Sequence, residues 1–322
     1  MVSVIIPLYN AQEYMQVCIE SVQKQTYSDL QILLVDDGSS DNTLQLARKM
    51  ALSDHRVHVI TQNNAGPGAA RNNGLAHCIG EFVCFVDSDD YLAPNAIQVM
   101  LDAMDKEIDV VQCRAEKVYS NGRKDSDVWG NDKISLSNFE AMKDYLYKSK
   151  PIVRFAVWAK LYRRTVTQGA EFPSIKNSED VVFNAYVISK CRKILYIPEI
   201  LYHATVRDLS LSHCPISEQK IMSSMLCNEL LRELIESEPL YKPLVGRIYW
   251  SSITTMEALI EQLLESDLNN KNQIKQVVIR KCADIKIPYK TLSFKQKLFK
   301  SIFQMAPVCT AKVISLIKNV IS

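Results

Sequence analysis

Three carboxylates within four positions follow an apolar run in the first third of the chain. The run covers residues 82–86, and the acidic residues are Asp87, Asp89 and Asp90. Like charges this close disfavour one another, so the cluster needs a cation or hydrogen-bond donors nearby. The D-x-D pair offers hard oxygen ligands, which suit Mg²⁺ or Mn²⁺ bridging a diphosphate. The plainer interpretation is a solvated helix start before Pro94, where aspartate is favourable in any case.

Three earlier apolar runs also end in side chains that suit a small polar ligand. The residues at their ends are Tyr9 with Asn10, Asp36 with Asp37, and Asn63 with Asn64. Tyr9 offers a flat face for a base, and the two aspartates can accept hydrogen bonds from a base N–H or a ribose hydroxyl. Taken singly, each has a plainer explanation, such as a core tyrosine or a turn before a helix. In a parallel sheet these ends share one ligand-binding edge, so four of them in order favour a ligand site.

The segments between these ends are the elements that must position them. Helical spacing of apolar residues is expected in three stretches, and short strands in four others. The helices are expected in 11–25, in 40–51 and, after a short loop, within 66–78, and the strands in 3–10, 30–39, 56–64 and 80–90. Short strands that alternate with amphipathic helices predict an α/β fold, with a mostly parallel sheet and helices on both faces.

The rest of the chain is less regular and then becomes helical. Between 95 and 215 the patterns predict one strand, two helices and a strand-turn-strand unit, at 109–120, 137–147, 178–191 and 193–206. After residue 215 only Gly246 remains among the glycines, and two helices are expected around 222–234 and 253–263. We therefore expect two domains, residues 1–215 and 216–322.

The bulk composition excludes several classes of protein. The 322 residues have a net charge of +2, so no overall field favours nucleic acid as a partner. Nine cysteines without a C-x-x-C pair indicate reduced thiols rather than disulfides or a zinc site. No signal peptide is expected, and no apolar stretch reaches the roughly 18 residues of a spanning helix.

Six blocks of the sequence, in order, resemble the family 2 glycosyltransferases, which have the GT-A fold. The resemblance is highly specific and covers roughly residues 2–215. The blocks are VSVIIPLYNAQEYMQVCIESVQKQTY, ILLVDDGSSDNT, NNAGPGAARNNGL, GEFVCFVDSDDYLAP, VWAKLYRR and SEDVVFNAYV. The resemblance implies that the first domain is catalytic and binds a nucleotide-sugar donor.

The resemblance also implies a role for individual residues. Those that would bind the donor are Pro7 and Tyr9 at the base, Asp36 or Asp37 at its uracil-type edge, Arg71 beside the nucleotide, Asp87 with Ser88 at the ribose, and Lys160 and Arg207 near the phosphates or the acceptor. Asp89 would be a metal ligand. His203 could be a second one, or simply a half-buried strand histidine.

The implied chemistry is an inverting sugar transfer. A divalent cation on Asp89 would stabilise the leaving diphosphate, and Asp180 would take the proton from the attacking hydroxyl. The acceptor would be a glycan or a lipid-linked saccharide in surface polysaccharide synthesis, and UDP is the expected nucleotide. Two alternatives remain, a binding domain without turnover and a nucleotidyltransferase. The latter normally has a glycine-rich, basic loop after its first strand, which PLYNAQEY does not provide.

The end of the chain is basic and amphipathic. Residues 286–318 carry seven lysines and no acidic residue, and Pro307 divides them into two expected helices, near 292–305 and 309–320. Such a segment can lie in an anionic membrane surface, although packing on its own domain is an equally good interpretation. We expect a cytoplasmic protein with peripheral contact at the inner face of the cell membrane.

Overall fold

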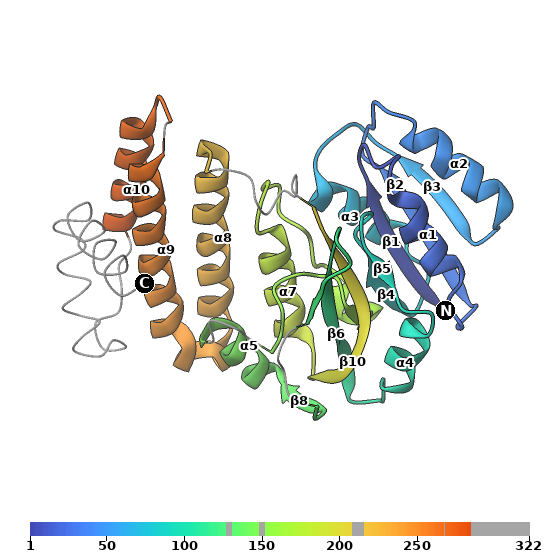
Figure 1. The fold of residues 1–322 in the computed structure, drawn as a ribbon. Helices are drawn as coiled ribbons and strands as arrows, with labels where there is room; N and C mark the ends of the chain where they lie inside the picture. The colour runs from blue at the N-terminus through green and yellow to red at the C-terminus, as the bar shows by residue number, and fades with distance from the viewer. Residues whose placement is uncertain (127–130, 148–151, 208–215, 267, 285–322) are drawn as a thin grey trace. The chain divides into compact units, whose positions relative to one another are not determined.

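The structure is a computed structural model that forms two compact units (Figure 1). The residues it describes are 1–126, 131–147, 152–207, 216–266 and 268–284. One unit comprises Met1–Ser174 with Glu179–His213, and the other Ile175–Ser178 with Cys214–Ser322. The domain boundary predicted after residue 215 falls next to a stretch outside the described residues, and it stays a prediction. The tail helices predicted within 286–322 also lie outside them.

The first half of the α/β unit follows the predicted alternation of strands and helices. Its strands are β1 (Val2–Leu8), β2 (Leu30–Asp36), β3 (Val57–Thr61) and β4 (Phe82–Phe85), which run parallel in the order β3-β2-β1-β4. The helices between them are α1 (Met15–Gln23), α2 (Thr43–Ser53) and α3 (Pro67–Ala76). The parallel arrangement brings the carboxyl ends of all four strands to one edge, as predicted.

Helices cover both faces of this sheet. Val4 and Ile6 lie in a buried cluster with α1, whereas Ile5, on the other face, meets α3 at Gly74. A Cβ at Gly74 would lie 2.5 Å from Ile5 Cγ2, so only glycine lets α3 approach β1 this closely. The same two-sided cover explains why β1 is apolar at nearly every position.

Beyond β4 the strands run in both directions and complete the central sheet of the predicted α/β fold. The order continues β4-β9-β6-β10-β5, with β9 antiparallel to β4 and to β6. These strands and two that pair beside them are β5 (Tyr91–Leu92), β6 (Ile108–Tyr119), β7 (Lys124–Ser126), β8 (Ile134–Ser137), β9 (Lys160–Arg163) and β10 (Lys193–Val206).

The strand-turn-strand unit predicted at 193–206 is wrong in one respect. The structure has a single strand there, β10, which pairs in parallel with β6 along its whole length. Its register shifts between Tyr196 and Ile200 and again between Ile200 and Tyr202, around Pro198. A proline cannot donate to the ladder, so it produces an irregularity that resembles a turn in the sequence. The remaining helices of this unit are α4 (Ala96–Asp102), α5 (Asn138–Tyr147), α6 (Arg164–Thr167) and α7 (Glu179–Lys190).

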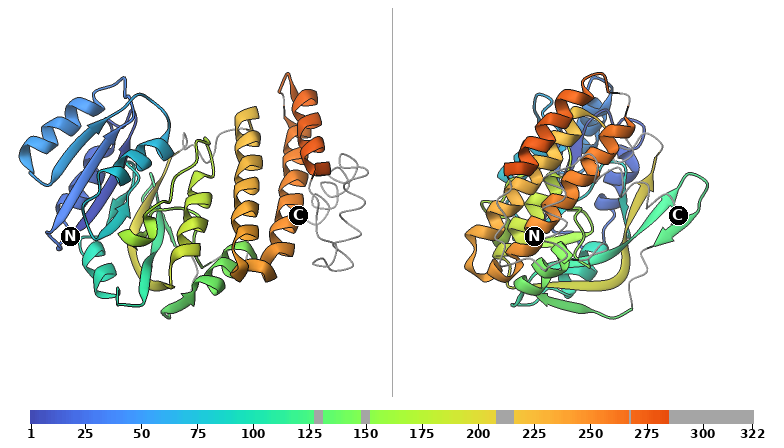
Figure 2. Two further views of the ribbon diagram at one scale, coloured as in Figure 1. Left: turned by 180° about the vertical axis from the view of Figure 1, so that it is seen from behind. Right: turned by 90° about the vertical axis from the view of Figure 1, so that its left-hand side faces the viewer.

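The second unit is helical, as predicted. Its described elements are α8 (Glu218–Ser237), the 3₁₀ helix η2 (Pro239–Leu244), α9 (Val245–Glu265) and α10 (Lys271–Asp284). Figure 2 shows α8, α9 and α10 side by side, with α9 in the middle. Ile253, Met256 and Ile260 of α9 are buried at helical spacing. Among the described residues, no helix is long and apolar enough to cross a membrane.

Candidate functional site

The loops after β1 and β2 are bonded to each other at the carboxyl edge of the sheet. The Asn10 N–H donates to Ser39 Oγ at 3.0 Å, and the Ser40 N–H donates to Asn10 Oδ1 at 2.9 Å. Tyr9 stands beside this junction and is 51% exposed, so it is not the core tyrosine of the plainer interpretation. Pro7 is half-buried within β1, opposite Val35 of β2. Pro7 and Tyr9 thus lie near the carboxyl end of β1, and their predicted contact with a base stays a prediction.

Asp36 and Asp37 are both buried, but their contacts differ. Asp37 Oδ1 accepts hydrogen bonds from Gln62 Nε2 at 2.8 Å and from the Ala65 N–H at 2.9 Å, and its Oδ2 accepts one from the Gly66 N–H at 2.8 Å. Asp37 therefore holds the loop that begins α3. Asp36 Oδ1 is buried and has no hydrogen-bond partner in the part of the chain that the structure describes. Of the two, Asp36 has the acceptor to spare for a ligand.

The residues after β4 form a tight turn that Asp90 anchors. The Asp90 N–H donates to Asp87 O at 3.0 Å, which places Ser88 and Asp89 at the tip. The Asp90 side chain accepts from Tyr202 Oη at 2.6 Å and from the Thr205 N–H at 2.8 Å. Burial, together with the neighbouring carboxylates, raises the pKa of Asp90 well above its usual value. Asp90 thus ties the turn to β10.

Asp89 lies near the end of β10. Arg207 Nε is 3.8 Å from Asp89 Oδ2, and the Arg207 guanidinium lies 3.4 Å from the centroid of the Tyr14 ring. Burial and the charge of Asp87 raise the pKa of Asp89, although Arg207 opposes this. At 3.8 Å Arg207 is too far for a direct hydrogen bond to Asp89, so this carboxylate is only partly neutralised.

Asp180 occupies the first turn of α7, where the helix dipole favours an acidic residue. Its Oδ1 accepts a hydrogen bond from Arg71 Nη1 at 3.0 Å, and its Oδ2 accepts one from the Val157 N–H at 3.3 Å. The same guanidinium also contacts Asp87 Oδ1 at 2.8 Å. Arg71 of α3 therefore contacts both Asp180, the predicted base, and Asp87, the predicted ribose ligand.

The protonation of Asp180 is poised near neutral pH. Burial raises the pKa of Asp180 to about 6, and the charges of Glu179 and Asp87 act in the same direction against Arg71. A carboxylate with this pKa is ionised at pH 7 and still has appreciable affinity for a proton. It can accept a proton from a hydroxyl more readily than an ordinary surface aspartate.

Lys160 is not presented to solvent. Only 1% of it is exposed, and Nζ donates to the backbone oxygens of Arg154, at 3.0 Å, and of Ala156. Burial and the nearby Arg154 lower the pKa of Lys160 to about 7. The structure therefore gives Lys160 a role in holding the segment before β9, and its predicted contact with phosphates or acceptor stays a prediction.

His203 has partners on the neighbouring strands β6 and β5. Its Nδ1 lies 2.8 Å from Glu116 Oε1, and its ring stacks on Tyr91 with 4.5 Å between centroids. Burial lowers the pKa of His203, although Glu116 opposes this. These contacts match the alternative of a half-buried strand histidine, and metal ligation by His203 stays a prediction.

The donor set still fits a divalent cation. Within the described ranges, no three His, Cys, Asp or Glu side chains gather as a metal cage. Mg²⁺ commonly takes one or two carboxylates from the protein and completes its shell with water and substrate phosphates. Asp87 and Asp89, on one turn and incompletely neutralised, offer such a partial set.

Sequence reasoning did not assign two residues that shape this site. Glu179 contacts Arg71 Nη1 at 3.1 Å, and Tyr202 donates to Asp90 while it accepts from the Asp87 N–H at 3.2 Å. Glu179 stands beside Asp180 in the acidic pair, so the sequence contains a local signal for it. Tyr202 has no local signal, because its partners are more than a hundred residues away.

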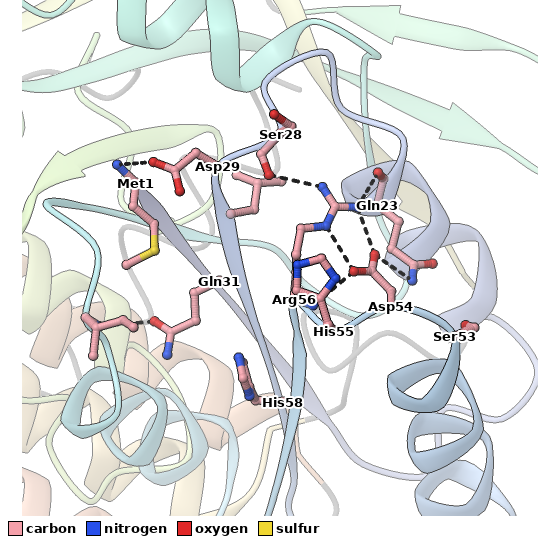
Figure 3. Close-up of a pocket in the computed structure, with 12 residues that line it drawn as sticks. Met1, Gln23, Ser28, Asp29, Gln31, Ser53, Asp54, His55, Arg56 and His58 are labelled. Atoms are coloured by element: carbon pink, nitrogen blue, oxygen red, sulfur yellow. Dashed lines mark hydrogen bonds and ion pairs between the residues drawn. The ribbon is translucent and has the colours of Figure 1, made fainter.

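The opposite edge of the sheet carries an open pocket without any predicted site residue (Figure 3). In it, Arg56 donates to both oxygens of Asp54, at 3.0 and 2.8 Å, and to the backbone oxygens of Gln23 and Ser28. The hydrogen bonds from Arg56 lower the pKa of Asp54 to about 2. Arg56 and Asp54 thus neutralise each other, as in an ion pair that stabilises the fold.

Comparison with known proteins identifies the family. The family model described as "Glycosyl transferase family 2" matches residues 3–168, more than half of the 322 residues. EpsH from Bacillus subtilis is 32% identical over 209 residues, which cover 63% of this chain and 60% of EpsH. Glycosyltransferase GlyA from Streptococcus pneumoniae is 30% identical over 223 residues, which cover 66% of this chain and 31% of GlyA. The chain thus spans well under two thirds of either relative.

A solved structure shows the same fold. TarS 1–349 from S. aureus, in complex with UDP-GlcNAc, matches with a TM-score of 0.74 and 23% identity, over 96% of this chain and 89% of that chain. The fold and the family predicted from the sequence are therefore confirmed. The chain belongs to glycosyl transferase family 2 and has the GT-A fold.

Proposed function

We propose that this protein transfers a sugar from a nucleotide-diphosphate sugar, with UDP as the nucleotide, to a hydroxyl of a glycan or lipid-linked acceptor. The observation that carries the proposal is the shared guanidinium of Arg71. It holds Asp180 and Asp87 within hydrogen-bond distance of one side chain, at the strand edge where ligands of this fold class bind. Membership of the family and the UDP-GlcNAc complex of TarS support it.

The residues at the carboxyl edge of the sheet have separate roles in this proposal. Tyr9 and Pro7 border the base, and the spare oxygen of Asp36 accepts a base N–H. Asp87, with Ser88 beside it, meets the ribose. Asp89 holds the divalent cation, Mg²⁺ or Mn²⁺, which when bound supplies charge stabilisation to the leaving diphosphate. Arg207, at the other side of Asp89, adds positive charge to the same place.

Asp180 takes the proton of the acceptor hydroxyl. One base with in-line attack inverts the anomeric carbon, so an α-linked donor gives a β-linked product. The family also serves surface polysaccharide synthesis, and we propose that role here. We also propose a cytoplasmic location and peripheral contact with the membrane. The basic tail on which this contact rests lies outside the described residues.

A donor panel tests the proposal. The protein is incubated with Mn²⁺ and each of several UDP-, GDP- and dTDP-sugars, and released nucleoside diphosphate and pyrophosphate are measured separately. We expect nucleoside diphosphate from a UDP-sugar, with a further increase when a hydroxyl acceptor is present. Release of pyrophosphate would indicate a nucleotidyltransferase, and binding without any release would indicate a domain without turnover.

A further inference from the structure

One guanidinium connects three carboxylates from two separate elements. Arg71 Nη2 donates to Asp87 in the turn after β4, and Nη1 donates to Glu179 and Asp180 at the start of α7. The Arg71 side chain is only 6% exposed. Each terminal nitrogen of Arg71 thus contacts at least one protein carboxylate, and the predicted contact of Arg71 with the nucleotide stays a prediction.

The backbone that carries Arg71 is fixed on several sides. Asp37 holds the Gly66 N–H just before α3, and the contact of Gly74 with Ile5 presses the helix onto β1. At Gly68, a Cβ would lie 3.2 Å from Glu179 Cγ, so the missing side chain lets α7 begin close to α3. Arg71 thus projects from a rigid helix toward a helix start that packs against it.

An aromatic ring lies against the guanidinium as well. The Phe172 ring centroid lies 5.5 Å from Arg71 Cζ, and the Phe172 ring stacks on Phe183 of α7 with 4.1 Å between centroids. A planar guanidinium against a ring keeps its orientation better than a flexible ammonium. The direction of the two N–H donors is therefore set by the fold before any ligand arrives.

We propose that Arg71 is a positioning residue that orients the Asp180 carboxylate and fixes it to the turn carrying Asp87, and that Glu179 completes this network. The inference rests on the proposed function, because it assigns Asp180 the proton transfer. A single guanidinium with donors in a rigid fork can hold two carboxylates in fixed relative geometry. The distance between the Asp180 carboxylate and the turn that carries Asp87 is thereby fixed before any ligand binds. A fixed orientation of the reacting groups raises the rate of the chemical step.

The charges facing Asp180 give the network a measurable signature. From α3 it meets Arg71, from its own helix Glu179, from the turn Asp87, and from β9 the side chains of Lys160 and Tyr162. Arg71 favours the ionised carboxylate, whereas Glu179 disfavours it. Loss of the Glu179 charge must therefore shift the ionisation of Asp180 to lower pH.

The test compares Arg71→Lys and Glu179→Gln with Arg56→Lys as a matched control. Arg56 is also bound to a carboxylate in the same unit, but it lies at the opposite edge of the sheet. For each variant we measure kcat, the Kd of UDP, the acid limb of the pH–rate profile and the thermal midpoint. Arg71→Lys keeps the charge and loses the fork, so kcat should fall by roughly ten- to a hundredfold while the Kd of UDP changes by less than about threefold.

Glu179→Gln keeps the packing and should move the acid limb to lower pH, whereas Arg56→Lys should leave kcat and the acid limb as in the wild type. A Kd of UDP raised more than about tenfold in Arg71→Lys, with kcat unchanged, would show that Arg71 contacts the nucleotide and would overturn the inference. An acid limb in Glu179→Gln identical to that of the wild type would do the same. A wild-type protein inactive with every donor would instead overturn the proposed function, and this inference with it.

Discussion

Arg56 and Arg71 belong to the same α/β unit, yet they create opposite electrostatic environments at the two edges of its sheet. Arg56 meets a single carboxylate with two of its nitrogens, and the pKa of Asp54 falls to about 2. Arg71 is shared among three carboxylates, and burial together with this crowding raises the pKa of Asp180 to about 6. Burial first, and then the ratio of charges, determines the protonation of the partner, rather than the mere presence of an arginine.

The balance of charges distinguishes a chemical site from a structural one within the same fold. At the amino edge the charges are matched, so the pair contributes to stability and to little else. At the carboxyl edge the carboxylates outnumber the cations, and this imbalance favours a metal ion and a mobile proton. Substitutions at the carboxyl edge should therefore change activity, and those at the amino edge should change stability.

The largest effect is expected from Asp89→Ala at the carboxyl edge. A bridging cation would lose its main protein ligand, so metal-dependent release of nucleoside diphosphate should be abolished. The measurement is release from the active UDP-sugar across a Mn²⁺ titration, with Asp54→Ala as the amino-edge control. Full activity of Asp89→Ala in chelator-treated buffer would show that turnover needs no metal ion at this edge.

Asp180→Asn should lower turnover by roughly 10²- to 10⁴-fold, the usual contribution of a positioned base. The amide keeps the shape of the side chain but cannot take a proton from the acceptor. Single-turnover kinetics and donor binding are measured in parallel, and donor affinity should stay close to that of the wild type. If affinity fell and the turnover of bound donor did not, Asp180 would be a binding residue.

The pH dependence should report the unbalanced edge directly. Because Asp180 must be ionised to act as base and its pKa is about 6, kcat/KM should be roughly tenfold lower at pH 5 than its plateau value. The profile is measured from pH 4.5 to 8 with the thermal midpoint checked at each value. A profile that stays flat down to pH 5 would contradict the raised pKa.

The smallest effect is expected from Asp54→Asn, on stability alone. The variant should lose about 1 kcal/mol, or roughly 2–4 °C in thermal midpoint, at pH 7, with turnover unaffected. The folded pKa of Asp54 lies below its ordinary value of 3.8, so the pair stabilises above about pH 4 and this contribution is lost as pH falls through about 2. The difference in midpoint should therefore shrink at pH 3. A loss of turnover like that of Asp180→Asn would break the comparison between the edges.

The sequence predicts the first half of the fold well because each signal there is local. The runs that became β1 to β4 and the helices between them are visible in windows of ten to fifteen residues. Chain order in a parallel sheet then places Asp36 and Asp87 at one edge without further information. Family resemblance adds proposed roles for these residues, which the geometry does not by itself assign.

The contacts that organise the site could not be predicted in this way. Arg71 meets Glu179 and Asp180 across 108 and 109 positions of sequence. The burial of Lys160 depends on the segment that folds back over it, and the environment of His203 depends on the register of β10 with β6. Such features depend on tertiary packing, which no local pattern records.

Adjacent aspartates at the end of β2 differ in how freely they can change. Asp37 uses both carboxylate oxygens to hold the loop before α3, so its replacement displaces the helix that carries Arg71. Among the described residues, the Asp36 side chain accepts only from the Ser39 N–H, at 3.3 Å, and its other oxygen has no hydrogen-bond partner. Because Asp36 is itself buried, a library of small polar residues at position 36 would test nucleotide preference in folded proteins, whereas the same library at position 37 would also lose the hydrogen bonds that hold the loop before α3. Asp36 can thus be varied without displacing α3, whereas the neighbouring and chemically identical Asp37 cannot.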